Sequence, residues 1–590
     1  MFKRILFLFI LFTVFSCKTG QKSSEISSTK GLFELFVEDG DRNTFYSNKK
    51  GVLAEKGMVA SAHFEASEIG KEILKKGGNA VDAAVATFFA LAVVHPFAGN
   101  LGGGGFAVIR ESSGKNHALD FREKAPLMAH RDMYLDANGD VIRELSTLGH
   151  LASGVPGSVA GMAEMHKKLG SLKWEILLQP AIDLAKKGVA LTDGQAKGMN
   201  RYKETFQKVN GVDTPYFIKP TNGVWEVGEL FVQSDLAESL KRIRDFGADG
   251  FYKGITADFL VKEMQNNSGI ISHDDLLKYD AIWRDPVEKS YKEYKIISMP
   301  LPSSGGIALI QLMRLVEQYP LKEWGWNTAN TTQVMIEAER RVYADRAKWL
   351  GDTDFVKVPQ NELMSYPYLE ERWASFNVNK ASKSSEINGG DVSFYESDQT
   401  THFSVVDKNS MAVSLTTTLN GAYGSKVVVA GAGFLMNNEM DDFSVKAGVP
   451  NMFGLVGNKA NEIQPEKRML SSMTPTILEK DGQLFMVVGT PGGSTIITSV
   501  YQTILNVAEH GMGMQQAVNA LKFHHQWLPD KTFFEKDAIE VEELQILLNK
   551  GYLIEFQNST LGRMDCILVH PNGVLEGASD PRGENTSIGY

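Results

Sequence analysis

The sequence has little of three things, and each shortage narrows what the protein can be. It has two cysteines, Cys17 and Cys566, in 590 residues. If Cys17 carries a lipid, as argued below, no disulfide can form within the chain, and stability must come from packing. The formal net charge is -10, and no basic cluster lies in the body of the chain, which argues against binding to nucleic acid. Apart from the N-terminal segment, no apolar run is long enough to span a bilayer.

Several well-known catalytic and cofactor motifs are also missing. The chain has no GxSxG nucleophile turn, no Walker phosphate loop and no HExxH zinc motif. The glycine run Gly102–Gly105 lacks the strand order and the distal acid of a dinucleotide site. His524 and His525 are adjacent, so their side chains should diverge, and no cysteine or acidic cluster lies near them. We therefore read them as structural histidines and expect no metal and no organic cofactor.

The N-terminal segment has the pattern of an export signal. A short positive stretch, MFKR, precedes an apolar core, Ile5–Phe15, that is too short for a comfortable membrane span. Ser16-Cys17 then resembles a bacterial lipoprotein processing site, with Cys17 as the lipidated residue, although Val14 and Phe15 make the match loose. The alternative is a plain signal peptide with an incidental cysteine. Either way we expect an exported protein, in the bacterial periplasm or anchored to a membrane as a lipoprotein.

The first half of the body alternates strand and helix patterns. Residues 18–57 are predicted to be a flexible lead-in, with structure starting near Met58. A strand and then a helix follow, and Gly77-Gly78 is a plausible helix end. Residues 79–96 begin with Asn79 as N-cap, stop at Pro96 and are apolar nearly all round, which predicts a buried helix. A short strand, Phe106–Arg110, follows the four glycines, and a second strand ends in DFRE.

The second half shows strand pairs and glycine turns. Residues 338–352 predict an amphipathic helix that ends near Gly351. Two strands joined by a turn at 408–410 follow Thr400, and residues 426–438 predict a further strand. A hairpin around Asp481-Gly482 leads through a glycine turn into a helix that starts near Ser494. The pattern fits stacked sheets flanked by helices, which is a mixed α/β layered fold.

The stretch DQTTHFSVVD, Asp398–Asp407, marks a sharp change of character along the chain. A polar, strand-poor run precedes it and a strand-like, hydroxyl-rich run follows. It can be a loop entering a strand, an ordinary hydroxyl nucleophile, or a chain break. An internal threonine is a poor nucleophile. If the bond between Gln399 and Thr400 is cut, however, Thr400 gains an α-amine with a pKa of roughly 8 that can act as its own general base.

Motifs along the chain decide among these readings. The sequence resembles the γ-glutamyltransferase (γ-glutamyl transpeptidase) family of N-terminal-nucleophile hydrolases from Met58 to Tyr590. The stretches that carry the resemblance are GMVAS, GGNAVDAAVA, HPFAGNLGGGGF, DFRE, ASGVPGSVAG, PSSGG, YADR, QTTHFSVVD, MDDFS, LSSMTPT, GTPGGS, FHHQW and ASDPR. The resemblance implies a four-layer αββα sandwich. It also implies self-cleavage between Gln399 and Thr400 into a large subunit, 58–399, and a small catalytic subunit, 400–590. These would remain together as one intertwined unit, preceded by the signal in residues 1–17.

The resemblance also implies roles for scattered residues in binding a γ-glutamyl donor. An arginine fork and hydroxyls suit the donor's α-carboxylate, and acceptor side chains suit its α-ammonium. Backbone amides at a glycine turn suit the developing oxyanion. The matching positions are Thr400 as nucleophile and Thr418 as its orienting partner, Gly492 and Gly493 as oxyanion donors, Arg122, Ser471 and Ser472 for the carboxylate, and Asn420, Glu439 and Asp442 for the ammonium.

Each of these residues also has an ordinary structural reading. Arg122 could form a surface ion pair with Asp120 or Glu123, and Asp442 could cap a helix or carry a solvated charge. The two glycines could form a plain tight turn, and Thr418 could belong to one face of a strand. The structural interpretation predicts that these side chains are exposed and apart from one another. The functional interpretation predicts that they are buried and lie together in one site.

The implied reaction has glutathione and related γ-glutamyl compounds as donors, and water, amino acids or short peptides as acceptors. Phe443–Gly457 resembles the lid loop that covers the substrate in many bacterial members, and Phe453 stands where those enzymes often carry tyrosine. The lid argues against the related β-lactam acylases, which lack it. Two alternatives remain: an acylase of the same superfamily that cleaves another amide, such as glutaryl-cephalosporin or poly-γ-glutamate, or an inactive lipoprotein that only binds γ-glutamyl compounds.

Overall fold

The structure, a computed structural model, describes residues 51–211, 217–219, 223–387 and 400–590. The predicted signal peptide, Cys17 and Gln399 lie outside the described residues.

Two seven-stranded sheets form the centre of the molecule, and all neighbouring strands within them are antiparallel. The first sheet has the order β1 (Val52–Ala54), β18 (Leu575–Ser579), β17 (Asp565–Val569), β13 (Gln483–Val488), β12 (Thr476–Lys480), β9 (Tyr294–Ser298) and β8 (Val287–Tyr291). The second has the order β19 (Thr586–Gly589), β2 (Met58–Ser61), β10 (Thr400–Val406), β11 (Ala412–Thr418), β3 (Gly104–Arg110), β4 (Asn116–Phe121) and β7 (Ile282–Arg284).

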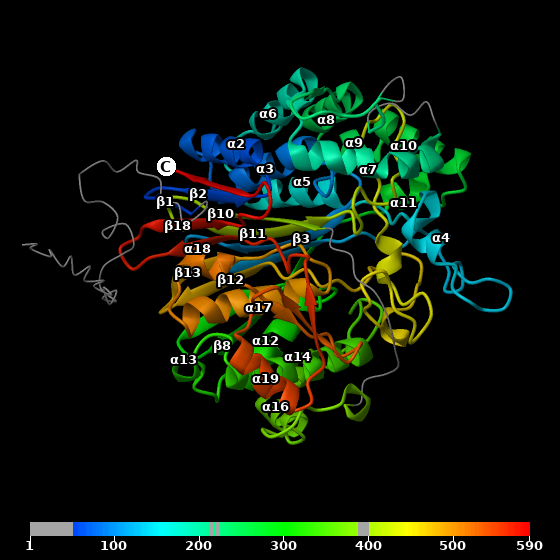
Figure 1. Cartoon of the computed structure of the whole chain (residues 1–590). Helices are drawn as coiled ribbons and strands as arrows, with labels where there is room; N and C mark the ends of the chain where they lie inside the picture. The colour runs from blue at the N-terminus through cyan, green and yellow to red at the C-terminus, as the bar shows by residue number, and fades with distance from the viewer. Residues whose placement is uncertain (1–50, 212–216, 220–222, 388–399) are drawn as a thin grey trace, which may run out of the picture.

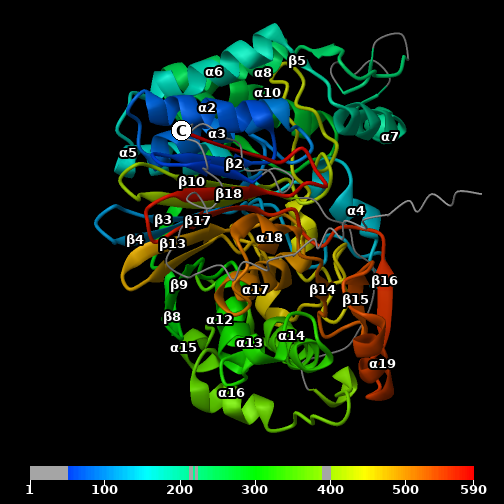
Figure 2. The same cartoon turned by 60° about the vertical axis from the view of Figure 1, so that its left-hand side comes forward.

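Helices cover the outer face of each sheet, and Figures 1 and 2 show the resulting four layers from two sides. The helices over the second sheet are α2 (Phe64–Lys75), α3 (Ala80–Val94), α5 (Ser158–Leu169), α6 (Trp174–Lys187), α8 (Ser234–Phe246), α9 (Asp249–Tyr252), α10 (Gly254–Asn266) and α11 (His273–Leu277). Those over the first sheet are α12 (Gly305–Val316), α13 (Leu321–Trp324), α14 (Ala329–Trp349), α15 (Gln360–Leu363), α16 (Tyr366–Trp373), α17 (Thr495–Ala508), α18 (Met514–Asn519) and α19 (Val541–Asn549). The predicted αββα sandwich is confirmed.

Smaller elements complete the fold at its edges. They are α4 (Arg143–Thr147), α7 (Asp193–Asn210), the two-stranded pair β5 (Val189–Ala190) and β6 (Leu230–Phe231), the three-stranded sheet of β14 (Phe523–His524), β15 (Thr532–Glu535) and β16 (Ile554–Gln557), and the 3-10 turns η1 (His150–Ala152), η3 (Ser384–Glu386), η4 (Glu439–Asp442) and η5 (Lys459–Asn461).

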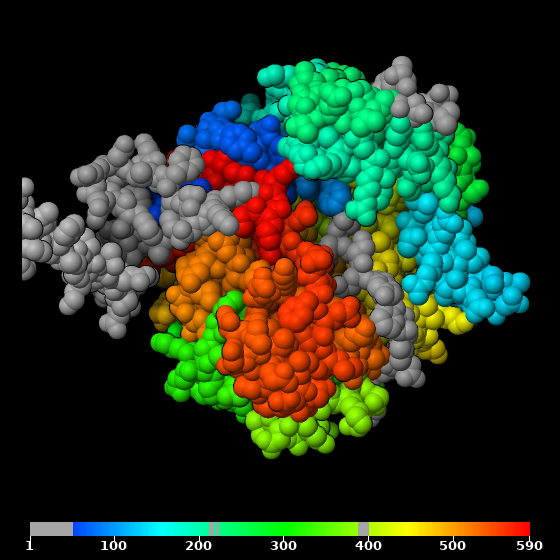
Figure 3. All heavy atoms as spheres, in the orientation of Figure 1, coloured from blue at the N-terminus to red at the C-terminus, as the bar shows by residue number. Residues whose placement is uncertain are grey.

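Segments before and after Thr400 are interleaved in both sheets. The hairpin β10–β11 lies between β2 and β3 in the second sheet, and β12 pairs with β9 in the first. In the surface view of Figure 3, the orange and red end of the chain lies between the teal helices above and the green segments below. The two halves therefore do not form separate lobes.

Several local predictions are confirmed by the element boundaries. Asn79 caps α3 in a capping box with Asp82, because the Asn79 side chain accepts from the Asp82 amide and the Asp82 carboxylate accepts from the Asn79 amide. Every residue of α3 is buried, as its apolar sequence requires. The Asp481-Gly482 turn has positive φ at both residues and joins β12 to β13.

Three local predictions are wrong. Residues 426–438 do not form a strand: Gly431 and Gly433 have positive φ and fold the segment back on itself, leaving only an isolated bridge between Val428 and Leu435. Ordered structure begins before Met58, because β1 lies inside the predicted lead-in and pairs with β18. A local pattern could not reveal β1, since its partner lies near the other end of the chain.

Helix α14 is not amphipathic. Most of its charged side chains are buried along with its apolar ones instead of facing water; they are Glu337, Glu339, Arg340, Arg341, Asp345 and Arg346. Arg341, for example, pairs with Glu337 at 2.6 Å one helical turn away. A charged residue in a helix is predicted to face solvent, because the sequence does not show whether a buried partner is present.

Candidate active site

Thr400 is the first residue of β10, and its side chain faces the space between the two sheets. Successive side chains of a strand point to opposite faces, so Thr400, His402 and Ser404 share one face. Ser404 Oγ donates to the carbonyl of Asp565 in the other sheet at 2.8 Å, which identifies that face as the inner one. Phe403, on the opposite face, packs into the core beneath α3. The strand thus directs Thr400 inward, toward the meeting point of the two sheets.

The neighbouring strand places Thr418 opposite Thr400. The two are register partners at the same end of the β10–β11 hairpin. Thr418 Oγ1 accepts from the Asn420 amide at 2.7 Å, and Asn420 has a φ of 71°, so the chain turns sharply as it leaves β11. This turn directs the chain from the strand end into the pocket that contains Thr400.

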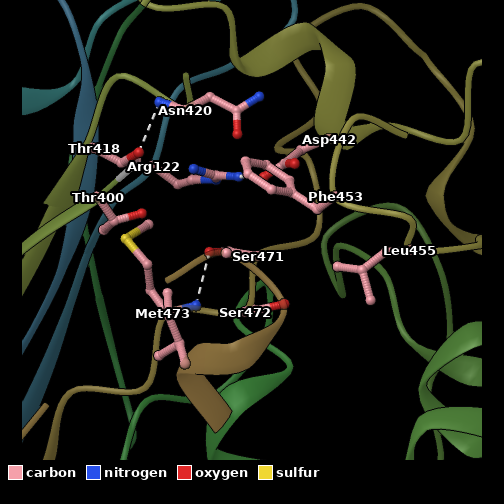
Figure 4. A pocket seen from close by; sticks show the side chains of 12 residues that line it. Arg122, Thr400, Thr418, Asn420, Asp442, Phe453, Leu455, Ser471, Ser472 and Met473 are labelled. Carbon is pink, nitrogen blue, oxygen red and sulfur yellow. Dashed lines mark hydrogen bonds and ion pairs between the residues drawn. The ribbon is translucent and has the colours of Figure 1, made fainter. Parts of the chain in front are cut away.

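A pocket brings most of the predicted site residues together (Figure 4). The predicted residues that line it are Arg122, Thr400, Thr418, Asn420, Asp442, Ser471, Ser472 and Gly493, and the others are Phe453, Leu455, Met473 and Ile496. Glu439 and Gly492 do not line it. Glu439 lies behind Arg122, and Gly492 immediately precedes Gly493.

Arg122, just beyond β4, is held by carboxylates from a distant segment. Its Nη2 donates to Asp442 Oδ2 at 2.5 Å, and its Nη1 lies 2.7 Å from Glu439 Oε2 and 3.5 Å from Glu123 Oε2. Arg122 is 1% exposed, so the reading as a surface ion pair is wrong. Asp442 is no solvated charge either, because its carboxylate pairs with this buried guanidinium.

One guanidinium meets three carboxyl groups, of which those of Glu123 and Glu439 are buried and that of Asp442 is 10% exposed, so full ionisation of all three would leave an excess of negative charge. Burial raises the pKa of Glu123 and the pKa of Glu439, although Arg122 opposes the shift in both. Burial also raises the pKa of Asp442, against the same opposing attraction from Arg122. An additional cation entering beside Asp442 and Glu439 would relieve this excess.

Ser471 and Ser472 form the floor of the pocket. Ser471 Oγ accepts from the Met473 amide at 3.1 Å, and the Ser471 carbonyl accepts from the Ser304 amide at 2.8 Å. Ser472 Oγ accepts from Nη2 of Arg346 at 3.1 Å. Burial lowers the pKa of Arg346 to about 10, so it remains a cation at neutral pH. The hydroxyls therefore sit between two buried guanidinium groups.

Gly492 and Gly493 form a turn immediately before α17. Their φ values are 141° and 52°, a region of backbone space that favours glycine. A side chain at Gly493 would also come within 2.6 Å of the Phe453 ring. Within the described part of the chain, neither of the two amide N–H groups donates a hydrogen bond. These donors are free for a ligand.

Residues 66–590 match the family described as gamma-glutamyltranspeptidase. The chain belongs to this family. It is 46% identical over 540 residues to the glutathione hydrolase proenzyme of Escherichia coli K12, a match that covers 91% of this chain and 93% of that one.

Two solved structures of other proteins have an architecture similar to that of this gamma-glutamyltranspeptidase family member. Helicobacter pylori gamma-glutamyltranspeptidase is 48% identical with a TM-score of 0.55, covering 56% of this chain and 94% of that one. A cephalosporin acylase from Bacillus halodurans is 25% identical with a TM-score of 0.81, covering 94% and 99%.

Sequence reasoning gave Glu123 only as a possible surface partner of Arg122, and it assigned no role to Arg346. In the structure Glu123 contacts Arg122 in a buried cluster, and Arg346 contacts Ser472. Both lie in stretches that carried the resemblance, DFRE and YADR, but nothing local indicated that Arg346 would meet Ser472.

The two adjacent histidines have the structural role that the sequence predicted. His524 lies 2.8 Å from Thr498 Oγ1 and 2.9 Å from Gln526 Oε1. His525 accepts from the Trp527 amide at 3.0 Å. Burial lowers the pKa of each histidine to about 4, so both are neutral.

Proposed function

We propose that the protein is a self-cleaving γ-glutamyltransferase that hydrolyses glutathione and related γ-glutamyl compounds or transfers their γ-glutamyl group to amino acids and short peptides. The observation that carries the proposal is the pocket in which Thr400 meets the ion pair of Arg122 with Asp442 and the glycine turn at Gly493. Family membership and the shared architecture support it.

The first step is maturation of the chain. Thr400 Oγ1 attacks the carbonyl of Gln399, and the acyl group moves from nitrogen to oxygen to form an ester. Water then hydrolyses the ester, leaving a carboxylate on Gln399 and a free α-amine on Thr400. The two products form a heterodimer of residues 58–399 and 400–590, held together because strands of both products pair with one another in each sheet.

Donor binding uses the charges described above. The donor's α-carboxylate pairs with Arg122 and accepts from Ser471 and Ser472, while its α-ammonium lies beside Asp442, Asn420 and Glu439. The zwitterion places its carboxylate on the guanidinium and its ammonium on the acidic side chains that share that guanidinium in the free site. Both ends of the donor head group are thereby matched in charge.

Catalysis then proceeds through an ester on Thr400. The free α-amine takes the proton from Thr400 Oγ1, which attacks the γ-amide carbonyl, and Thr418 holds the threonine in place. The amides of Gly492 and Gly493 stabilise the oxyanion. The leaving amine takes the proton from the Thr400 ammonium and departs, as cysteinylglycine does from glutathione. Water or an acceptor amine then attacks the ester and regenerates Thr400.

We propose that this chemistry occurs outside the cytoplasm. Residues 1–17 have the pattern of an export signal, and Cys17 would carry a lipid anchor. Within the part of the chain that the structure describes, no helix is long and apolar enough to cross a membrane.

Two anilides separate this function from that of an acylase. We expect γ-glutamyl anilide to be cleaved with a kcat/KM at least about 100-fold above that of glutaryl anilide, because only the former carries the ammonium that pairs with Asp442, whose side chain is 10% exposed. Release of the aniline measures both rates. Asp442→Asn is the control, and it should narrow the ratio. A preference for the glutaryl substrate would assign the protein to the acylases.

Phe453 offers a test of how the lid sets the balance between hydrolysis and transfer. Its ring lines the pocket beside Gly493 and carries no hydroxyl. We expect Phe453→Tyr to tighten the lid by adding a polar contact and so to change the ratio of transfer to hydrolysis by about threefold or more. Both rates are measured with and without a dipeptide acceptor. Identical ratios in the two proteins would show that the missing hydroxyl has no effect.

A further inference from the structure

The lid loop, Phe443–Gly457, separates two cavities. Phe453 and Leu455 line the pocket that contains Thr400. Pro450 and Met452, on the other side of the loop, line a second cavity together with residues of α4. In Figure 1, α4 lies beside the yellow segment that includes the loop. The loop therefore has an inner face toward the donor site and an outer face toward α4.

Asp441 connects the outer face of the lid loop to α4. Its Oδ2 accepts from the Met452 amide at 2.7 Å, and its Oδ1 accepts from Ser146 Oγ at 2.7 Å. Asp441 is 4% exposed, so both bonds are shielded from water. Its neighbour Asp442 faces the other way and accepts from Asn451 Nδ2 at 3.0 Å. Two consecutive aspartates thus hold two consecutive residues of the loop.

The residue that Asp441 holds also touches the donor site. The Met452 sulfur lies 3.7 Å from Nδ2 of Asn420 and 3.5 Å from Nδ2 of Asn438. Asn420 lines the Thr400 pocket, and its own Nδ2 also donates to the Asn438 carbonyl at 2.9 Å. The position of the Met452 backbone therefore bears directly on the placement of Asn420.

We propose that Asp441 is a positioning residue that tethers the lid loop, through Met452 and Ser146, in the closed arrangement that binds the γ-glutamyl donor. This role rests on one part of the proposed function, namely that the donor binds in the pocket that contains Thr400. Asp441 itself does not touch the donor.

The charge of Asp441 makes the tether sensitive to pH. Burial raises the pKa of Asp441 to about 6, and Asp442 adds to the rise, while the bonds from Ser146 and Met452 and the charge of Arg143 oppose it. Tyr134 also faces Asp441 and is neutral, since burial raises the pKa of its phenol well above the usual value. A protonated carboxyl can still make both bonds, with its O–H donating to Ser146 Oγ, but these neutral hydrogen bonds are weaker than those of the carboxylate. The tether is therefore complete above about pH 6 and weakens as the pH falls through that value.

Two substitutions at this position separate the tether from the charge. In Asp441→Asn the amide oxygen can accept from Met452, and the amide nitrogen can donate to Ser146 Oγ, so the tether survives but no longer titrates. Asp441→Ala removes both bonds. Ser146→Ala removes only the link to α4. It leaves the carboxylate in place, so it tests the tether even if Asp441→Ala fails to fold.

Hydrogen exchange of residues 443–457 in the mature, ligand-free protein measures the tether directly. We expect Asp441→Ala and Ser146→Ala to lose protection there, with KM for γ-glutamyl anilide raised about tenfold in Asp441→Ala and kcat changed by less than about threefold. Asp441→Asn should show protection and KM between those of the wild type and Asp441→Ala, because it keeps both bonds only in their weaker, neutral form. Wild-type protection should fall as the pH drops through about 6, and that of Asp441→Asn should not.

The outcomes distinguish this inference from the proposed function. Wild-type lid protection and KM in Asp441→Ala would overturn the tether. Equal loss in the asparagine and alanine variants would also overturn it, because asparagine preserves both hydrogen bonds. A wild-type protein that shows the exchange pattern but does not cleave the anilide would leave the tether standing and refute the proposed function.

Discussion

Thr400→Ala should remain a single chain and lose turnover of γ-glutamyl anilide by on the order of 10⁴-fold or more, because the same hydroxyl cuts the chain and forms the acyl ester. The wild type should give two fragments, the smaller beginning at Thr400. Intact-mass analysis of the two purified proteins, run beside the anilide assay, measures both effects. The loss is so large because no other group in the proposed mechanism can form the ester.

Thr401→Ala is the matched control for this experiment. Thr401 is adjacent, equally a threonine and 1% exposed, but its side chain points to the opposite face of β10. Its hydroxyl has no hydrogen-bond partner among the described residues, so its removal should leave cleavage and turnover intact. A correctly folded wild type that stays whole would refute the assignment of Thr400, and so would a Thr400→Ala variant that still cuts itself.

Arg122→Lys should lower kcat/KM for γ-glutamyl anilide by about 100-fold to 1,000-fold. Lysine keeps the charge, but it cannot bridge Glu439 and Asp442 while also presenting two donors to the α-carboxylate of the donor. Steady-state kinetics on protein that has cleaved itself measures the effect, since cleavage shows that the fold and the nucleophile are intact.

Arg110→Lys provides a comparison at a second buried arginine. Arg110 ends β3 and pairs with Glu479 at 2.6 Å, and it does not line the pocket. Its substitution should lower thermal stability and leave kcat/KM within about threefold of wild type. If both arginine variants lost activity to the same extent, the effect would be one of stability, and Arg122 would have no specific part in donor binding.

Where local chemistry is decisive, the sequence predicted the structure well. Asn79 caps its helix because its side chain can satisfy an amide three residues away, and Asp481-Gly482 turns because both residues accept positive φ. Thr400 stood out because polar loop chemistry changes to strand chemistry at that residue. These features depend on neighbours within a few residues, which a sequence displays directly.

The features that the sequence did not predict depend on distant partners. β1 is ordered by β18, and buried charges of α14 meet distant partners, such as Asp530 for Arg340 and Ser472 for Arg346. The cluster around Arg122 joins residues more than 300 positions apart, so the motif resemblance could name Glu439 and Asp442 but could not show them sharing this guanidinium. The tether at Asp441 was missed for the same reason, because the neighbouring Asp442 carried the recognisable role.

The position of the β10–β11 hairpin between β2 and β3 links cleavage of the chain to the completion of folding. Until the hairpin docks, the second sheet is open in the middle, and Thr400 is apart from Arg122 and from the glycine turn. We therefore expect cleavage to follow docking of the hairpin, so that a cut chain indicates a completed second sheet. In the proposed mechanism the uncut chain has the Thr400 hydroxyl but not its free α-amine, so turnover of a γ-glutamyl donor should begin only after cleavage.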